Sequence, residues 1–111
     1  MSKKKAAKRA RVVIVDDHPA VREALALRIS RQPDLEFCGE AADTSEALRL
    51  VAHTRPDIAV VDISLKTGNG IDLIKRIKDR NDHVRILAIT GSNERTSVKP
   101  ARALYDTLGN P

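Results

Sequence analysis

Short apolar runs alternate with amphipathic segments along most of the chain, and the runs predict four strands. Residues 12–15 and 58–61 are unbroken apolar stretches, a pattern typical of strands that are covered on both faces. Residues 35–41 alternate instead and predict a strand at the edge of the sheet. A fourth strand is expected over residues 84–89. In the alternating segment, one face is expected to hold Leu35, Phe37 and Ala41, and the other Glu36 and Glu40.

Three amphipathic segments between these runs predict helices. The first begins near Pro19, because the missing N–H of proline costs nothing in a first turn, and it stops at Pro33. Thr44 or Ser45 can cap the second helix. The apolar positions expected to face the sheet are Val21, Leu25 and Ile29 in the first helix, Ala47, Leu48 and Val51 in the second, and Ile71, Ile74 and Ile77 in the third.

Strand and helix alternate with short connections, which is typical of an open parallel sheet with helices on both faces. The expected fold class is therefore α/β and doubly wound, with the first and third strands as central neighbours. Asp16 and Asp17 follow the first strand, and Asp62 ends the third. Because ligands of such folds bind outside the carboxyl ends of the strands, the three carboxylates are expected to converge at a binding site.

Three neighbouring carboxylates need a cation, because like charges in one site otherwise favour protonation. A site with only oxygen ligands suits a hard ion, and Mg²⁺ is the first candidate. Asp62 can then attack a phosphoryl donor, since its carboxylate is already ionised at neutral pH, while Asp16 and Asp17 hold the ion. The hydroxyl of Thr90, at the end of the fourth strand, can donate a hydrogen bond to a bound phosphoryl oxygen.

Most of these residues also have a structural interpretation. Asp16 and Asp17 can cap the first helix, since carboxylates favour helix N-termini, and Thr90 can be a structural hydroxyl. Asp62 has no comparable role, because a charge at the end of a buried strand needs a partner. The three carboxylates together therefore favour a site. His18 is expected only to shape the loop before the first helix.

The composition describes one domain without a membrane span. The chain has 111 residues, of which 41% are hydrophobic and 32% charged, and no apolar run approaches the ~20 residues that cross a bilayer. The N-terminus lacks the pattern of a secretory signal, so we expect a cytoplasmic protein that does not associate with membranes. Cys38 is the only cysteine and is expected to be a small buried strand residue.

The net charge of +5 is concentrated at the N-terminus. Residues 1–11 hold six of the 20 Lys and Arg residues and no acidic residue, which leaves 14 basic against 15 acidic residues in the rest of the chain. We expect a basic disordered arm over residues 1–11 and a nearly neutral domain over residues 12–111. Nucleic-acid binding through the arm is a weaker alternative, and Phe37 and Tyr105 are too few aromatic residues for a base-stacking surface.

Four motifs in combination carry a resemblance to a known family. They are Val-Asp-Asp-His-Pro at 15–19, Val-Asp-Ile-Ser-Leu at 61–65, Gly-Asn-Gly at 68–70 and Ile-Thr-Gly at 89–91. From Arg11 to about Ser92 the chain resembles the receiver domain of two-component response regulators, and looks most like receivers that are joined to a helix-turn-helix output domain. The resemblance implies a flavodoxin-like strand order 2-1-3-4. It also implies a phosphoryl group accepted from a histidine kinase or a phosphotransfer protein.

The resemblance assigns a role to each candidate site residue. It implies that Asp62 is the phosphoacceptor, that Asp17 is a direct Mg²⁺ ligand, and that Asp16 acts on the ion largely through water. The backbone carbonyl of Ser64 would be a third ligand, and Thr90 the switch hydroxyl. The implied function is that of a signalling domain in a phosphorelay rather than an enzyme.

The C-terminal part departs from the family pattern. The family has a lysine at the end of a fifth strand, some twenty-odd residues beyond the switch hydroxyl, whereas Lys99 follows Thr90 closely and stands where the family has a helix. Lys66 replaces a usual proline, which is expected to loosen its loop. We expect the fifth strand and the last helix to be missing or altered, with one further helical stretch over residues 101–108.

These departures leave two expectations about interactions. Without the last strand and helix, the fourth strand becomes an apolar edge and the surface beside the first helix lies open, so residues 12–111 are expected to self-associate. Without the family lysine, a receiver-like interaction module that does not switch on phosphorylation is the alternative function.

Overall fold

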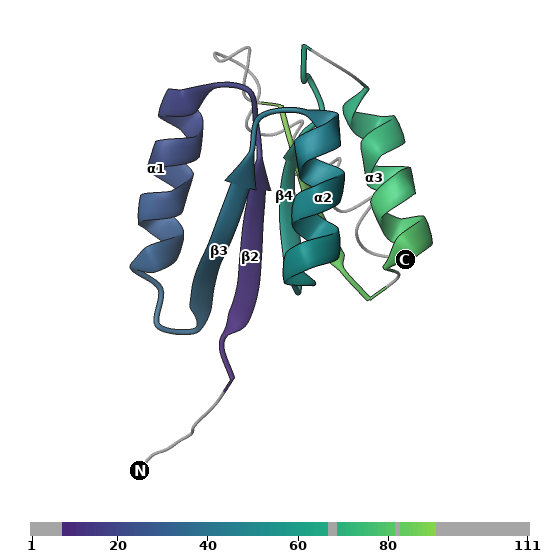
Figure 1. Cartoon of the computed structure of the whole chain (residues 1–111). Coiled ribbons are helices and arrows are strands. Elements are labelled where there is room, and N and C mark those ends of the chain that lie inside the picture. The colour runs from purple at the N-terminus through teal and green to yellow at the C-terminus, as the bar shows by residue number, and fades with distance from the viewer. Residues whose placement is uncertain (1–7, 67–68, 82, 91–111) are drawn as a thin grey trace.

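A computed structural model describes residues 8–66, 69–81 and 83–90, which form a parallel sheet flanked by helices (Figure 1). The strands are β2 (Ala10–Val15), β3 (Leu35–Ala41), β4 (Ile58–Asp62) and β5 (Arg85–Ile89), and the helices are α1 (Pro19–Ser30), α2 (Thr44–Thr54) and α3 (Gly70–Arg80). The strands lie in the order β3-β2-β4-β5 and every pair is parallel. The predicted α/β class and the order 2-1-3-4 are both confirmed.

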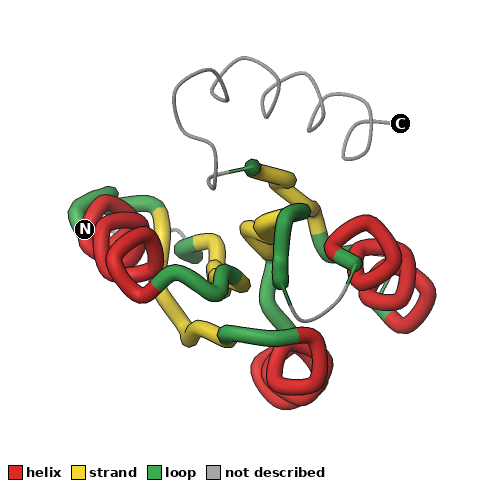
Figure 2. The backbone as a smooth tube through the Cα atoms, turned by 90° about the horizontal axis from the view of Figure 1, so that it is seen from above, coloured by secondary structure: helices red, strands yellow, loops and turns green. Residues whose placement is uncertain are grey.

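The sheet separates two apolar cores. Helix α1 covers one face and helices α2 and α3 cover the other, as the view along the strands shows (Figure 2). Residues of β2 and β4 enter both cores, which explains why their sequences are apolar without interruption. The core beneath α2 and α3 includes Val13, Val15, Val61, Leu73 and Ile77, and the core beneath α1 includes Val12, Ile14, Ile29 and Val60.

Strand β2 begins two residues earlier than the apolar run suggests. Ala10 pairs with Leu35, and the Ala10 N–H donates to the Asp34 carbonyl at 2.9 Å. Backbone pairing with the neighbouring strand, and not side-chain hydrophobicity, therefore decides where β2 starts. The expected arm overlaps the strand at Ala10 and Arg11, and its first seven residues lie outside the described part of the chain.

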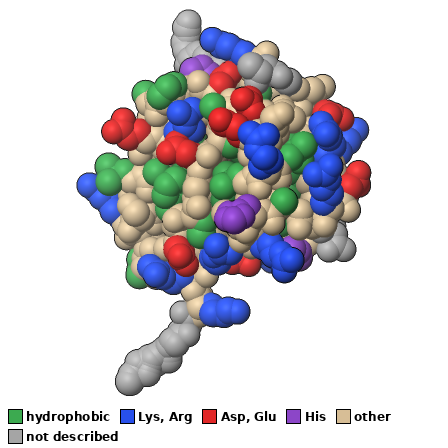
Figure 3. Space-filling view, in the orientation of Figure 1, with side chains coloured by type: hydrophobic (Ala, Val, Ile, Leu, Met, Phe, Trp, Pro, Cys, Tyr) green, Lys and Arg blue, Asp and Glu red, His purple; other side chains and the backbone are tan. Residues whose placement is uncertain are grey.

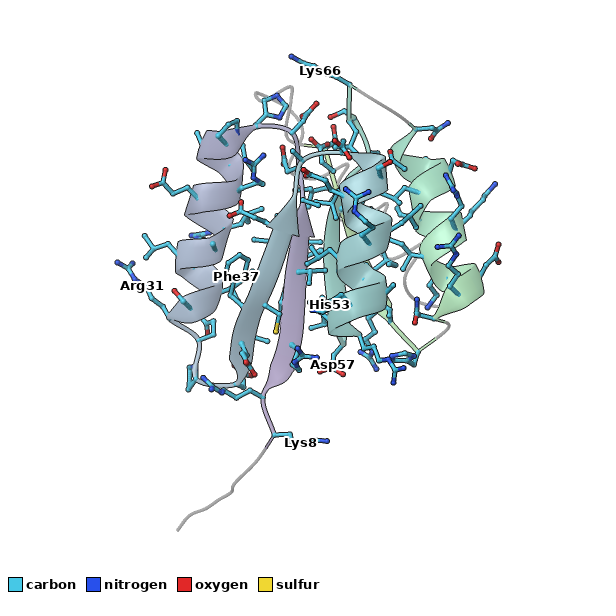
Figure 4. The ribbon with its side chains drawn as sticks, viewed as in Figure 1. Lys8, Arg31, Phe37, His53, Asp57 and Lys66 are labelled. Carbon is cyan, nitrogen blue, oxygen red and sulfur yellow. The ribbon has the colours of Figure 1, made fainter. Side chains whose placement is uncertain are left out.

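The edge position of β3 is confirmed, but the predicted division of its side chains between the two faces is wrong. The β2–β3 register shifts between Val12, which pairs with Phe37, and Val13, which pairs with Gly39. This bulge moves the residues after it to the opposite faces, with Gly39 at a φ of 154°. Phe37, before the bulge, packs beneath α1, as its side chain in Figure 4 shows, whereas Ala41, after the bulge, joins the core beneath α2 and α3.

All three helices differ in detail from the prediction, and the first two do so as follows. Pro19 does begin α1, but only Ile29 of its predicted stripe is buried, and Leu25 is partly buried against the same core. Helix α2 is capped by Asp43, not by Thr44 or Ser45, because the Asp43 carboxylate accepts the Glu46 N–H at 2.9 Å. The predicted inward positions of α2 are confirmed for Ala47 and Val51 and lie at the core margin for Leu48.

Helix α3 turns Leu73 to the core where Ile71 was expected. Asn69 caps the helix by accepting the N–H of Ile71 and of Asp72, which leaves Ile71 in the first turn and partly exposed. Leu73, Ile74 and Ile77 then make the buried stripe at helical spacing. The outer surface of α3 carries Lys and Arg side chains, including Lys75, Arg76 and Arg80 (Figure 3).

The C-terminal expectations fall on residues 91–111, which lie outside the described part of the chain. They concern the fifth strand, the last helix, the stretch over residues 101–108 and Lys99. Within residues 8–66, 69–81 and 83–90, β5 is an edge strand, as expected of the fourth strand. No helix in those ranges has both the length and the apolar character needed to cross a bilayer.

Candidate functional site

The register of the central strands places two carboxylates side by side. Val15 of β2 pairs with Val61 of β4, so Asp16 and Asp62 come next on neighbouring strands at the same edge of the sheet. Both side chains are fully buried. One ligand atom from each of Asp16, Asp17, His18 and Asp62 lies within 4.8 Å of the other three. The predicted convergence of the three carboxylates is therefore confirmed, and an imidazole joins them.

Backbone N–H groups orient the first two carboxylates. Asp16 Oδ1 accepts the His18 N–H at 2.8 Å and the His18 imidazole Nδ1 at 2.9 Å. Asp17 Oδ2 accepts the Lys66 N–H at 2.9 Å from the loop after β4. Proline has no N–H to give, so Lys66 fastens the loop to Asp17 where the sequence led us to expect a looser connection. The Lys66 side chain itself extends away from the fold at the carboxyl end of the sheet (Figure 4).

The third carboxylate is held from its own loop. Asp62 Oδ1 accepts the Ser64 N–H at 2.9 Å and the Ser64 hydroxyl at 2.6 Å. Each carboxylate thus has one oxygen fixed by hydrogen bonds. The other oxygen of each is buried and has no hydrogen-bond partner among the described residues: Asp16 Oδ2, Asp17 Oδ1 and Asp62 Oδ2.

His18 is the site residue that sequence reasoning missed. Its Nδ1 lies 2.9 Å from Asp16 Oδ1, 3.0 Å from Asp17 Oδ1 and 3.8 Å from Asp62 Oδ2, while 34% of the side chain stays exposed. The hydrogen bond to Asp16, helped by the charges of all three carboxylates, raises the pKa of His18 above its ordinary 6.5. Its place between Asp17 and Pro19 was the available signal, since that position fixes it at the same strand end.

The surroundings of His18 favour its charged form, whereas burial favours the neutral form of Asp16. Removal from water raises the pKa of the Asp16 carboxyl above its ordinary 3.8, and the neighbouring charge of Asp62 adds to the effect, while the hydrogen bonds from His18 oppose it. An ionised Asp16 is therefore costly in the metal-free fold, and a bound cation would offset that cost.

Arg22 supports the site from α1. Its Nη1 donates to the Asp16 carbonyl at 2.7 Å, and its Nε donates to Glu40 Oε1 of β3 at 2.6 Å. One side chain thereby ties α1 to the ends of two strands. Glu40 reaches this position because the bulge in β3 turns it toward α1, so the interaction has no signal in the alternating pattern of the sequence.

Close backbone packing fixes the loop after β4. A Cβ on Gly70 would collide with the Ile63 backbone and lie 2.8 Å from the Asp62 carbonyl oxygen. The start of α3 can approach the end of β4 only because residue 70 is glycine. On the other side of β4, the Ile63 N–H donates to the Ile89 carbonyl at 2.8 Å.

The structure places Ser64 and Thr90 at the same edge of the sheet. Ser64 is two residues beyond Asp62 in the loop that the hydrogen bonds above define. Thr90 directly follows Ile89, the residue that pairs with Asp62, and is partly buried. All five predicted site residues therefore lie at the carboxyl-end edge of the sheet, after β2, β4 and β5 or at the end of β4.

The donor set fits a hard divalent cation. Three buried oxygens without hydrogen-bond partners are costly unless something positive meets them, and a Mg²⁺ ion prefers carboxylate, carbonyl and water oxygens. The acidic cluster is typical of a Mg²⁺ site. No described group of Cys and His residues offers an alternative metal cage.

Comparison with known proteins gives consistent matches over most of the chain. The sequence pattern of the response regulator receiver domain matches residues 12–104. The chain is 36% identical over 91 residues to the uncharacterized transcriptional regulatory protein YhcZ of Bacillus subtilis strain 168, covering 82% of this chain and 42% of that protein. It is 40% identical over 80 residues to the DNA-binding transcriptional activator DevR/DosR of Mycobacterium tuberculosis, covering 72% and 37%.

Solved structures agree with these relatives. The crystal structure of a two-component response regulator of the LuxR family from Aurantimonas sp. SI85-9A1 superposes with a TM-score of 0.74 at 37% identity, covering 93% of this chain and 70% of that one. The chain thus spans about two fifths of the length of the curated relatives named above and matches their receiver portion.

Proposed function

The chain belongs to the response regulator receiver family, and from that premise we propose that Asp62 accepts a phosphoryl group in phosphorelay signalling. Receivers of this kind are signalling domains of transcriptional regulators rather than enzymes. The observation that carries the proposal is the convergence of three carboxylates, of which Asp16 and Asp62 are fully buried, each with one oxygen held and the other without a hydrogen-bond partner among the described residues.

The same three carboxylates, together with the backbone carbonyl of Ser64, supply the proposed Mg²⁺ site. Asp17 and Asp62 would bind the ion through carboxylate oxygens and Ser64 through its backbone carbonyl, with Asp16 acting largely through water. When bound, Mg²⁺ supplies the positive charge that offsets the carboxylates and an incoming phosphoryl group. The Lys66 N–H keeps Asp17 turned toward the loop after β4, so the ligands come from both central strands.

Hydrogen bonds prepare Asp62 as the nucleophile. Because Ser64 holds Oδ1 with its N–H and its hydroxyl, Oδ2 is the atom left to attack. In the proposed step, Asp62 Oδ2 forms a bond to phosphorus while the P–N bond of a phosphohistidine breaks and its electron pair leaves with the imidazole nitrogen. Because Oδ1 is held, the Asp62 carboxylate does not need to change its orientation during the transfer.

Thr90 is the proposed sensor of the phosphoryl group. Because it follows the residue that pairs with Asp62, it lies at the end of the strand next to the acceptor. Its hydroxyl would donate to a phosphoryl oxygen and draw the end of β5 toward the site. Phosphorylation would thereby change the surface around β5.

Two-component receivers work with histidine kinases, and we extend this to the chain as a proposal. A sensor histidine kinase or a phosphotransfer protein would be the phosphoryl donor, and the encounter would take place in the cytoplasm. The DNA-binding role printed for the Mycobacterium tuberculosis relative describes that whole protein, of which this chain matches 37%.

Intact mass spectrometry tests the proposal directly. The full chain is incubated with a small phosphodonor and Mg²⁺, and we expect the mass of one phosphoryl group to be gained and then lost as the acyl phosphate hydrolyses. Asp62→Asn should gain nothing, whereas Asp79→Asn, an exposed position on α3, should gain as much as the wild type. A phosphoryl group retained in Asp62→Asn would refute the assignment.

The same experiment separates the alternatives. A chain that gains no mass under any donor concentration would instead be a receiver-like interaction module that does not switch. Binding to nucleic acid through residues 1–11 is the weaker alternative, and deletion of that segment together with a salt titration tests it.

A further inference from the structure

A cavity lies between the end of α1 and the start of β3, and the proposed phosphoacceptor site does not use it. Its volume is about 420 Å³, within the range of about 300–1,000 Å³ that is usual for small-molecule pockets. The residues that line it are Arg28, Ile29, Arg31, Gln32 and Leu35. Figure 4 shows Arg31 at the end of α1 that lies away from Lys66. The cavity is therefore at the amino ends of the strands, opposite the acidic cluster.

The apolar lining of the cavity is the margin of the core beneath α1. Ile29 is 8% exposed, and Leu35 packs against the same core. These two side chains can bury a small apolar group. Phe37 also packs against this core, so the alternation along β3 turns the carboxylate of Glu36, which lies between Leu35 and Phe37, to the other face of the sheet.

Two guanidinium groups stand at the same cavity. Arg28 and Arg31 are exposed, and neither side chain makes a hydrogen bond or an ion pair with another described residue. They are not needed to cap α1, because its last carbonyls already have partners. The Arg28 carbonyl accepts the Arg31 N–H at 3.2 Å. The Ile29 carbonyl accepts the Gln32 N–H at 3.0 Å.

Charge and apolar surface together indicate the class of ligand. The end of a helix carries roughly half a negative elementary charge, which the two positive charges of Arg28 and Arg31 exceed, so an anion is favoured there. Guanidinium groups bind carboxylate and phosphate oxygens through paired N–H donors, and the Gln32 amide offers a further donor.

We propose that the cavity binds a small organic anion. Its carboxylate or phosphate group lies at Arg28 and Arg31, and its apolar part lies against Ile29 and Leu35. An inorganic anion would leave the apolar lining uncovered, and a neutral apolar molecule would leave both guanidinium groups without a partner, so each would bind more weakly.

Titrations of the full chain, followed in ¹H–¹⁵N spectra, test the inference with hexanoate and hexyl phosphate as probes. We expect saturable shifts centred on residues 28–35. Binding should be at least about tenfold weaker for 1-hexanol, which lacks the charge, and for acetate, which lacks the apolar chain. Saturable binding of either probe supports the inference, and the tighter of the two identifies the head group. An absence of saturable shifts, or 1-hexanol binding as tightly as the anions, would overturn it.

Matched variants test the role of the two cations. Arg28→Gln and Arg31→Gln, both at exposed positions, should each weaken binding of the tighter probe at least about fivefold. Arg49→Gln removes the same charge from an exposed position of α2 and should leave the affinity unchanged within about twofold. An equal loss in all three variants would show a response to net charge alone and overturn the assignment. The inference is independent of the proposed function, because the cavity and the acidic cluster lie at opposite ends of the strands.

Discussion

At the scale of single residues, the site contains a buried charge that lowers the stability of the metal-free fold. Asp16 is fully buried, and one of its oxygens meets no hydrogen-bond donor among the described residues. Burial raises its pKa, so at neutral pH the ionised carboxylate destabilises the metal-free fold. A buried charge that lowers stability in this way is expected where the charge serves the function of the protein.

Asp16→Asn is therefore expected to stabilise the metal-free protein. The amide carbonyl can still accept the His18 N–H, while the buried charge and its repulsion by Asp62 disappear. Urea unfolding in EDTA should show an increase of about 1 kcal/mol in the free energy of unfolding. The extra stability that Mg²⁺ gives the wild type should shrink in the variant, and a variant that is less stable in EDTA would contradict this account of Asp16.

The imidazole of His18 offers a pH-dependent observable in the metal-free protein. Because its hydrogen bond to Asp16 raises the pKa in the folded state, folding favours the protonated ring. The resulting stabilisation is fully present below pH 6.5 and is lost as the pH rises through the higher folded-state value. NMR titration of the ring should give a pKa above 6.5 that falls in Asp16→Asn, and a ring titrating at 6.5 or below would be the opposite result.

The convergence of the carboxylates could be predicted from the sequence, whereas the direction of the His18 imidazole could not. Asp16, Asp17 and Asp62 stand at the ends of apolar runs, so the topology of a parallel sheet is enough to bring them together. The direction of the His18 ring depends on a side-chain torsion that no pattern encodes. The Lys66 N–H is a backbone group that any residue except proline would offer, so the sequence allows its bond to Asp17 without predicting it.

At the scale of elements, local backbone chemistry overrides periodicity. The pattern located β3, yet the bulge before Gly39 reverses the faces that alternation assigns to the residues after it. The helix caps Asp43 and Asn69 are decided by which side chain reaches a free N–H. These details matter for the site, since the bulge is what turns Glu40 toward Arg22.

Gly70→Ala tests the close approach of α3 to the end of β4. The added methyl group would collide with the Ile63 backbone, which must move and take Asp62 with it. We expect a loss of roughly 1–3 kcal/mol in the free energy of unfolding and a weaker Mg²⁺ affinity. Asn69→Ala is the control, because it removes the α3 cap at a cost of about 1 kcal/mol without crowding β4.

Comparison of the two variants distinguishes the effect of a steric collision at β4 from the effect of removing the α3 cap. Chemical-shift changes in Gly70→Ala should centre on residues 62–65, whereas those in Asn69→Ala should follow the first turn of α3. Equal Mg²⁺ affinities in the two variants would show that the packing at Gly70 does not position Asp62.

At the scale of the whole molecule, the two faces of the sheet are covered unequally by the described helices. Helices α2 and α3 share one face, whereas α1 is the described helix on the other. Ile58, Leu87 and Ile89 on that face are partly exposed within the described ranges. The alternation of strands and helices predicted the layers, because connection length and handedness restrict such a chain to few topologies, whereas the full strand order was implied by the resemblance to the receiver family.

Self-association through this face stays a prediction. Sedimentation over a range of concentrations should show the wild type forming dimers or larger species, and Leu87→Glu shifting the balance toward monomer. Ala52→Glu adds the same charge at an exposed position of α2 and should leave the balance unchanged. A folded wild-type monomer at every concentration would contradict the prediction.

The central claim is that one divalent cation binds among Asp16, Asp17 and Asp62, and paramagnetic broadening by Mn²⁺ measures this most directly. In ¹H–¹⁵N spectra of the full chain, substoichiometric Mn²⁺ should broaden first the amides of residues 16–18 and 62–66, and excess Mg²⁺ should restore them. Broadening spread over exposed acidic residues such as Asp79, or none at residues 16–18 and 62–66, would contradict the account.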